Sequence, residues 1–173
     1  MEQKKPITHI AAGLIIAALI ILFAITINFL GLTQEKGLGA IQYLIIIGGL
    51  VFFIYQHGKA HGYSKGFGDL FAFGFKTTAV FTAIYVVFIV LFFLLFPDIK
   101  EKTLEMAREK MGENSKLSES DIDKSVEMAR KFFWVGVVGG SMLVFIIIGA
   151  IGSLLGAAIT KKRPNTSTDQ LSV

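Results

Sequence analysis

The sequence predicts an all-α integral membrane protein with four transmembrane helices and an amphipathic helical hairpin between the third and the fourth. Apolar residues make up 53% of its 173 residues and charged residues only 17%, whereas soluble domains carry about 25% charged residues. The mean hydropathy is +0.64. Of the 30 charged residues, 17 lie between Asp98 and Lys131, so the rest of the chain is almost purely apolar. The length predicts one membrane domain over residues 1–173.

Four apolar stretches predict the membrane spans, at about residues 10–32, 38–55, 75–96 and 133–159. The first has 23 residues, and a helix of that length rises about 34 Å, enough to cross a hydrocarbon core of about 30 Å. It lacks the shorter apolar core and small-residue cleavage site of a secretory signal, so we expect a retained span. Pro97 stops the third span because it has no backbone N–H to continue the helix.

The polar insert, residues 97–131, is predicted to form two helices separated after Gly112. Ser118 is a predicted N-cap of the second helix, and Asp121 stands three residues later in the capping-box position. Because no proline separates Ser118 from the fourth span, the sequence leaves open whether this helix and the span are continuous. The polar tail, 164–173, is predicted to be disordered.

The distribution of basic residues predicts the orientation. Four spans bring both termini and the connector after the second span to the same side, and that side carries nearly pure basic flanks: Lys4, Lys5, Lys59, Lys65, Lys161, Lys162 and Arg163. The insert has eight basic and nine acidic residues. The positive-inside rule therefore favours cytoplasmic termini and an external insert. The net charge of +4 does not indicate nucleic-acid binding, because the basic residues are dispersed beside apolar spans.

The connector after the second span contains the candidate ligand residues. His57 and His61 are four residues apart and would share a face if helical, with Asp69 as the nearest third ligand. Gly58 and Gly62 argue against a helix there, so the sequence predicts no metal site and retains these three residues only as candidates. No cofactor is predicted, and with no cysteine the chain has no thiol chemistry.

Three lysines near the ends of the spans are candidates for lipid headgroup contact: Lys59, Lys65 and Lys76. The connector around the first two is rich in glycine, but it lacks the Gly-Lys-Ser or Gly-Lys-Thr of a phosphate-binding P-loop. A flexible turn with topogenic lysines is the simpler interpretation, and Lys76 fits a side chain that snorkels to the interface.

The fourth span is dense in small residues at intervals of four. Such faces allow helices to approach closely, either inside the four-helix bundle or between two copies of the chain, and the first is favoured. The predicted packing residues are Gly136, Gly140, Gly149, Gly152 and Gly156.

The leading functional hypothesis is a non-enzymatic partner-binding or assembly protein. The spans hold no carboxylate or arginine at depth, which argues against ion-coupled transport and indicates no catalytic site, although the sequence does not decide whether the chain is an enzyme. The second insert helix offers an apolar stripe for a membrane-protein partner or a second copy: Ile122, Val126, Ala129 and Phe133. If the stripe instead packs on Leu104, Ala107 and Met111, the hairpin is self-contained, and this remains open.

Two further hypotheses come from other classes. An oligomeric transporter of small molecules or lipids would be lined by residues of the third span such as Thr78 and Tyr85. A membrane-embedded lipid enzyme would use His57, His61 and Asp69, and it ranks last.

The order of several motifs resembles a known family. The segment Gly62–Thr77, GYSKGFGDLFAFGFKT, leads into the third span, Pro97-Asp98 ends it, and Ser118-Glu119-Ser120-Asp121-Ile122 opens the second insert helix before a glycine-rich last span with a Lys-Lys tail. This order is similar to the four-span bacterial membrane proteins of the domain-of-unknown-function family 4199, known mostly from Bacteroidota. The resemblance, over about Thr8–Arg163, implies an inner-membrane location and four spans, and it implies no activity.

Overall fold

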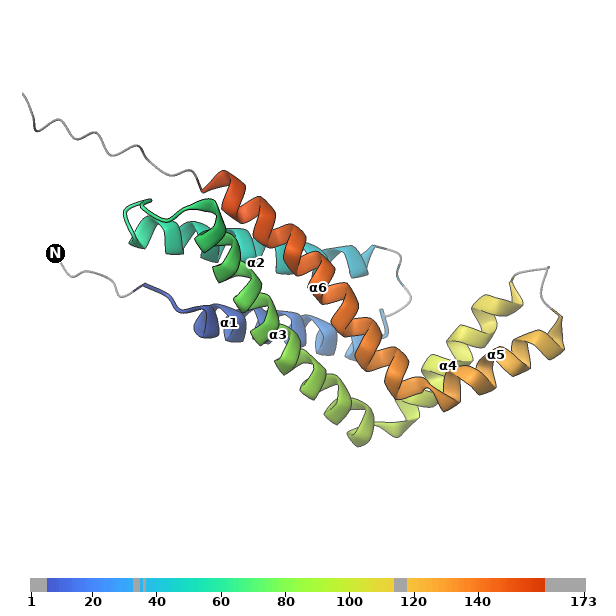
Figure 1. Cartoon of the computed structure of the whole chain (residues 1–173). Helices are drawn as coiled ribbons and strands as arrows, with labels where there is room; N and C mark the ends of the chain where they lie inside the picture. Colours follow the sequence, from blue (N-terminus) through green and yellow to red (C-terminus); the bar gives the residue numbers. More distant parts are fainter. Residues whose placement is uncertain (1–5, 33–34, 36, 114–117, 161–173) are drawn as a thin grey trace, which may run out of the picture. The chain divides into compact units, whose positions relative to one another are not determined.

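The computed structural model describes residues 6–32, 35, 37–113 and 118–160, which form six α-helices and no strand (Figure 1). The predicted all-α fold is therefore confirmed. The predicted disordered tail and the flanking lysines 4, 5, 161 and 162 lie outside the described residues. The helices are α1 (His9–Phe29), α2 (Leu38–Ala60), α3 (Phe67–Leu95), α4 (Pro97–Gly112), α5 (Glu119–Lys131) and α6 (Phe133–Ile159).

Four of these helices, α1, α2, α3 and α6, are long and apolar enough to cross a membrane, as predicted. Between 22% and 33% of the most apolar stretch of each is buried inside the protein, so most of its surface is left for lipid. Two helices outrun the predicted spans: α2 continues to Ala60 and α3 begins at Phe67. Hydropathy marks the apolar part of a helix, whereas the backbone stays helical until a capping residue ends it.

The end of α2 is set by Gly62 and not by Gly58. Gly62 has φ +58° and donates its N–H to the Lys59 carbonyl at 3.0 Å, while the N–H of Tyr63 donates to the Gly58 carbonyl at 2.8 Å. This pair of bonds is a Schellman motif, which suits a glycine because the left-handed conformation strains residues with a Cβ. The objection to a helix through His57 was therefore wrong.

The chain divides into two compact units, residues 1–81 with 146–173, and residues 82–145. Helices α3 and α6 each contribute to both. In the first unit, α1, α2, the start of α3 and the end of α6 pack together. Its fully buried large side chains include Ile16, Ile20, Ile46, Leu50, Ile54, Leu70 and Phe81.

Glycines allow α6 to approach α2 and α3 closely in this first unit. A Cβ placed on Gly152 would lie 2.8 Å from Leu50 Cδ1, and one on Gly156 would lie 2.6 Å from Ile54 Cδ1. A Cβ on Gly149 would overlap the Thr78 side chain, whose Cβ is only 2.8 Å away. These three predicted packing residues stand where another helix touches them.

Gly136 and Gly140 differ from the other three predicted packing residues. Both are exposed, and a Cβ on either would meet nothing within 4 Å. They form no contact with another helix in the part of the chain that the structure describes, and the expectation that all five pack in the bundle is corrected to this extent. Small residues at intervals of four make a face flat, but the spacing does not tell which face has a neighbour.

The second unit contains the end of α3, the hairpin α4–α5 and the start of α6. Helices α5 and α6 are separated by one residue, Phe132, with φ −101° and ψ 16°. The hydrogen bonds continue across it, because the Phe132 N–H donates to the Met128 carbonyl at 3.0 Å and the Gly136 N–H donates to the Phe132 carbonyl at 2.9 Å. The sequence left open whether the second insert helix and the fourth span are continuous. In the structure they are two helices, separated by a single residue.

Replacing Gly149 with alanine is predicted to destabilise the protein by about 1–3 kcal/mol, because the added methyl group overpacks against Thr78. Gly140→Ala on the same helix is the matched control, and it should be neutral or stabilising by up to about 1 kcal/mol through helix propensity. Thermal unfolding of the purified variants in detergent measures both. Equal unfolding temperatures for the two variants would contradict the assigned contact.

Candidate functional site

The histidines of the connector meet at the end of α2. His57 lies in the last turn of α2 and His61 is its C-cap residue, with ring centroids 4.4 Å apart. The His57 ring is half-buried and stacks on Phe73 of α3 at 4.0 Å, with an interplanar angle of 19°. One ring nitrogen of His61, Nδ1, lies 2.8 Å from the His57 carbonyl oxygen. The two rings are thus held by packing and by backbone contacts.

A third ligand does not join the two histidines. Asp69 is exposed in the first turn of α3. Among the described residues, no three His, Asp or Glu side chains are grouped so that they could hold a metal ion. The His57 Nδ1 atom is buried and has no hydrogen-bond partner within the described part of the chain. What this arrangement provides is an aromatic stack and one buried polar atom.

The three candidate headgroup lysines have different surroundings. Lys59, near the end of α2, and Lys76 on α3 are exposed, whereas Lys65 in the connector is partly buried. The glycine of the connector that adopts a left-handed conformation, Gly62, ends α2. The backbone N–H groups of Gly62 and Tyr63 are consequently used within the chain, which leaves them unable to bind a phosphate.

The second unit contains the predicted partner-binding stripe. Ile122 and Phe133 are buried, and Val126 and Ala129 are partly buried. Leu104 of α4 is buried as well, in the hairpin that α4 and α5 form by packing against each other. Phe133 also contacts Phe93 edge-on, with centroids 5.0 Å apart and an interplanar angle of 90°. The stripe thus lies largely in the contact between α4 and α5, which we call the seam of the hairpin.

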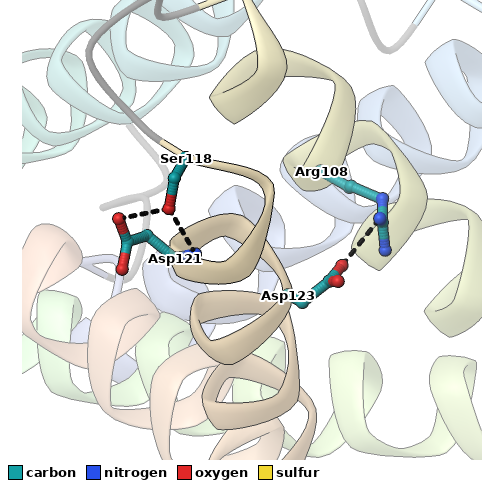
Figure 2. Close-up of polar contacts among 4 residues, drawn as sticks. All are labelled: Arg108, Ser118, Asp121 and Asp123. Atoms are coloured by element: carbon teal, nitrogen blue, oxygen red, sulfur yellow. Dashed lines mark hydrogen bonds and ion pairs between the residues drawn. The ribbon is translucent and has the colours of Figure 1, made fainter.

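Two ion pairs cross the hairpin. Arg130 donates to Glu101 with both guanidinium branches, at 2.9 Å from Nη1 to Oε1 and 2.7 Å from Nη2 to Oε2. Arg108 Nη2 lies 2.6 Å from Asp123 Oδ1 (Figure 2). The pairs are two helical turns apart on each helix and run in opposite directions along α4 and α5. They therefore define an antiparallel register.

The start of α5 is capped as the sequence predicts. The Ser118 hydroxyl accepts the Asp121 N–H at 3.2 Å and donates to Asp121 Oδ2 at 2.6 Å (Figure 2). Such a cap stabilises a helix by about 1 kcal/mol. The exposed ion pairs contribute about 0.2–1 kcal/mol each, whereas each buried large apolar side chain contributes about 1.5–3 kcal/mol. The seam therefore holds the hairpin together, and the charges select its register.

The polar residues of the third span are mostly bonded within their own helix. The Thr78 hydroxyl donates to the Gly74 carbonyl at 3.1 Å. Tyr85 is buried and lies edge-on to Phe145 at 4.8 Å. Thr82, also buried, has a hydroxyl with no hydrogen-bond partner among the residues described. Neither of the two residues named for the transport hypothesis presents an open polar surface.

Several structurally important residues were not singled out from the sequence. A Cβ on Gly74 would lie 2.6 Å from both Ile54 Cδ1 and Ser153 Oγ, and the Phe73 ring stacks on the His57 ring. Glycine in an apolar span is a signal for such an approach. The Glu101–Arg130 pair had no local signal, because its partners are 29 residues apart.

The comparisons with known proteins concern almost the whole chain. The model of a family described as "Protein of unknown function (DUF4199)" matches residues 11–162. No curated protein matches the chain, and no solved structure does.

Replacing His57 with phenylalanine is predicted to leave stability nearly unchanged, because the stack on Phe73 is kept and a buried nitrogen without a partner is removed. His57→Ala should cost about 1–3 kcal/mol through lost aromatic packing. Chemical denaturation of the purified variants with and without added zinc distinguishes packing from ligation. Stabilisation of the natural chain by zinc, lost equally in both variants, would contradict this assignment.

Proposed function

The chain belongs to the DUF4199 family of proteins of unknown function, and we propose that it is a non-enzymatic accessory or assembly protein that binds a partner through its hairpin. The single observation that carries the proposal is the hairpin itself, a packed two-helix element outside the apolar spans. Its second helix is capped by Ser118, and two ion pairs join the two helices. A surface ordered before binding loses little conformational entropy when a partner docks.

The docking surface that we propose is the outer face of α4. Because Ile122 and Phe133 are buried, the apolar stripe is not free to be the main contact. On the opposite side of α4, exposed residues spaced by three, four and seven positions line up on one face of the helix. They are Asp98, Lys102, Glu105, Glu109 and Glu113, four of them acidic. A partner with basic groups at the membrane surface would be attracted to this line.

The alternative, an oligomeric transporter, has less support. The Thr78 hydroxyl is bonded to its own helix and Tyr85 is buried against Phe145. A transport path needs polar groups that can face a solute. The Thr82 hydroxyl is the one group in the described part of the third span that favours this alternative, since it is buried and lacks a hydrogen-bond partner.

We further propose that the protein lies in the inner membrane of a bacterium with both termini in the cytoplasm. The support is the distribution of basic residues in the sequence, with Lys59 at the end of α2 and Lys65 in the α2–α3 connection on the basic side. In this orientation the hairpin faces the periplasm, and its partner would be a membrane or periplasmic protein.

Reversing two charges on the outer face of α4, Glu105→Lys with Glu109→Lys, is predicted to reduce recovery of a co-purifying protein about tenfold or more, because like charges would then face each other. The measurement is a mild-detergent pull-down of the tagged full chain from its native membrane, quantified by mass spectrometry. Glu127→Lys is the control, as it reverses one charge of the same sign at an exposed position of α5, half the charge change of the double variant. Recovery of a stoichiometric partner at the same level from all forms would contradict the assigned face.

Single-cysteine labelling tests the orientation, and the chain has no cysteine to remove first. In spheroplasts, a membrane-impermeant maleimide is expected to label Glu109→Cys at once and Lys59→Cys only after the membrane is opened. Both positions are exposed on the protein, so a difference in labelling reports the side of the membrane. The reverse pattern would show that the hairpin is cytoplasmic.

A further inference from the structure

Helix α5 has a second apolar strip on the side that faces away from α4. Met128, Phe132 and Val135 are 62%, 52% and 70% exposed. Their spacing of four and three residues puts them on one side of the helix. At about 100° per residue this side is roughly opposite to Arg130 and Asp123, which form ion pairs with α4. It is about a third of a turn from the buried or partly buried Ile122, Ala129 and Phe133.

The strip is continuous from α5 into α6. Hydrogen bonds from Phe132 to the Met128 carbonyl and from Gly136 to the Phe132 carbonyl keep helical spacing across the junction. Val135 and the exposed Met142 already belong to α6, a helix long and apolar enough to span the membrane. The part of the strip that belongs to α6 therefore lies against lipid. The same lipid surface adjoins the last turn of α5.

The depth of the strip follows from contacts at the junction. Phe133 and Trp134 lie edge-on to Phe93, at 5.0 and 6.3 Å between centroids, and Phe93 is in the last turn of α3 before Pro97. This contact puts Phe133 level with the end of the third span. Met128 is five residues further along, which is about 7 Å of helix rise. The polar headgroup layer adds about 5–7 Å to each side of the hydrocarbon core, so Met128 reaches its outer part.

A lysine borders the strip where lipid phosphates would lie. Lys131 Nζ is 5.8 Å from the centroid of the Phe132 ring. Lys131 is exposed, and it is two residues, about 3 Å of helix rise, from Phe133. It does not belong to the ion pairs that join α4 to α5. A lysine close to an anionic membrane surface gains about 1 kcal/mol, and aromatic and lysine side chains are typical of this layer.

We propose that the outer face of α5 is a membrane-contacting surface, on which Met128 and Phe132 sit in the lipid headgroup layer and Lys131 binds the phosphates of anionic lipids. The occupant is the bilayer in which α6 is anchored. The hairpin is then water-exposed on α4 and lipid-exposed on α5. This inference does not rest on the partner proposal, because it concerns the pure protein in a bilayer.

Spin labels on single cysteines test the depth. The label is attached to Met128→Cys and, as the control, to Glu105→Cys on the outer face of α4, in the full chain reconstituted into vesicles of phosphatidylethanolamine and phosphatidylglycerol. Power-saturation measurements compare collisions with oxygen, which concentrates in lipid, and with a water-soluble nickel chelate. We expect the oxygen-to-nickel ratio to be several-fold higher at 128 than at 105.

Equal ratios at the two positions would overturn the proposal, because the strip would then face water. Protection of position 128 from both reagents would also overturn it, since a protein would then cover the strip. Circular dichroism and elution volume check that each labelled variant is folded, and both substitutions are at exposed positions.

The lysine is tested by combining Lys131→Glu with the label at 128. The oxygen-to-nickel ratio should fall in vesicles that contain phosphatidylglycerol and stay unchanged in pure phosphatidylcholine. An equal response in the two lipids would overturn the assignment of Lys131 to phosphate binding and leave only an apolar contact.

Discussion

The close approach of α6 to α2 and α3 is the constraint on which the first compact unit depends. Lipid is as apolar as leucine, so burial of apolar surface does not drive helices together inside a bilayer, and dispersion contacts must do so. Gly149, Gly152 and Gly156 bring the backbone of α6 close enough to meet Thr78, Leu50 and Ile54. The nearby hydroxyls of Thr78 and Ser153 donate to carbonyls of their own helices, which avoids unpaired polar groups at depth.

The hairpin is held together by a different balance of forces because one side of it faces water. Burial of Leu104, Ile122 and Phe133 supplies most of its stability, and the two interhelical ion pairs select one antiparallel register. Lys100 lies 5.1 Å above the Phe133 ring, so even the base of the seam is bordered by charge. A hairpin organised in this way presents its charged outer surface already ordered, as the proposed binding of a partner requires.

The fold could be predicted from the sequence almost completely, whereas the candidate sites could be predicted only in part. Long apolar runs, Pro97 and the Ser118 cap are local signals, and each marks a helix or a helix end in the structure, although α2 and α3 extend beyond the predicted spans. What covers Ile122 and Phe133, by contrast, does not depend on neighbouring residues in the sequence. The same amphipathic stripe would serve a partner or the chain itself, and only the tertiary structure shows that Ile122 and Phe133 are buried within the chain. Likewise, the spacing of His57 and His61 allows ligation, but Phe73 and the exposed position of Asp69 make it an aromatic stack.

The sequence by itself determined that this is a four-span helical membrane protein with a polar hairpin, because hydropathy and helix capping act over a few neighbouring residues. The tertiary structure alone decided which small residues touch another helix. Gly149 meets Thr78 while Gly136 and Gly140 face no other part of the described chain, although all belong to similar patterns. The physical reason is that packing depends on the neighbour as much as on the residue, and the neighbour is distant in the sequence.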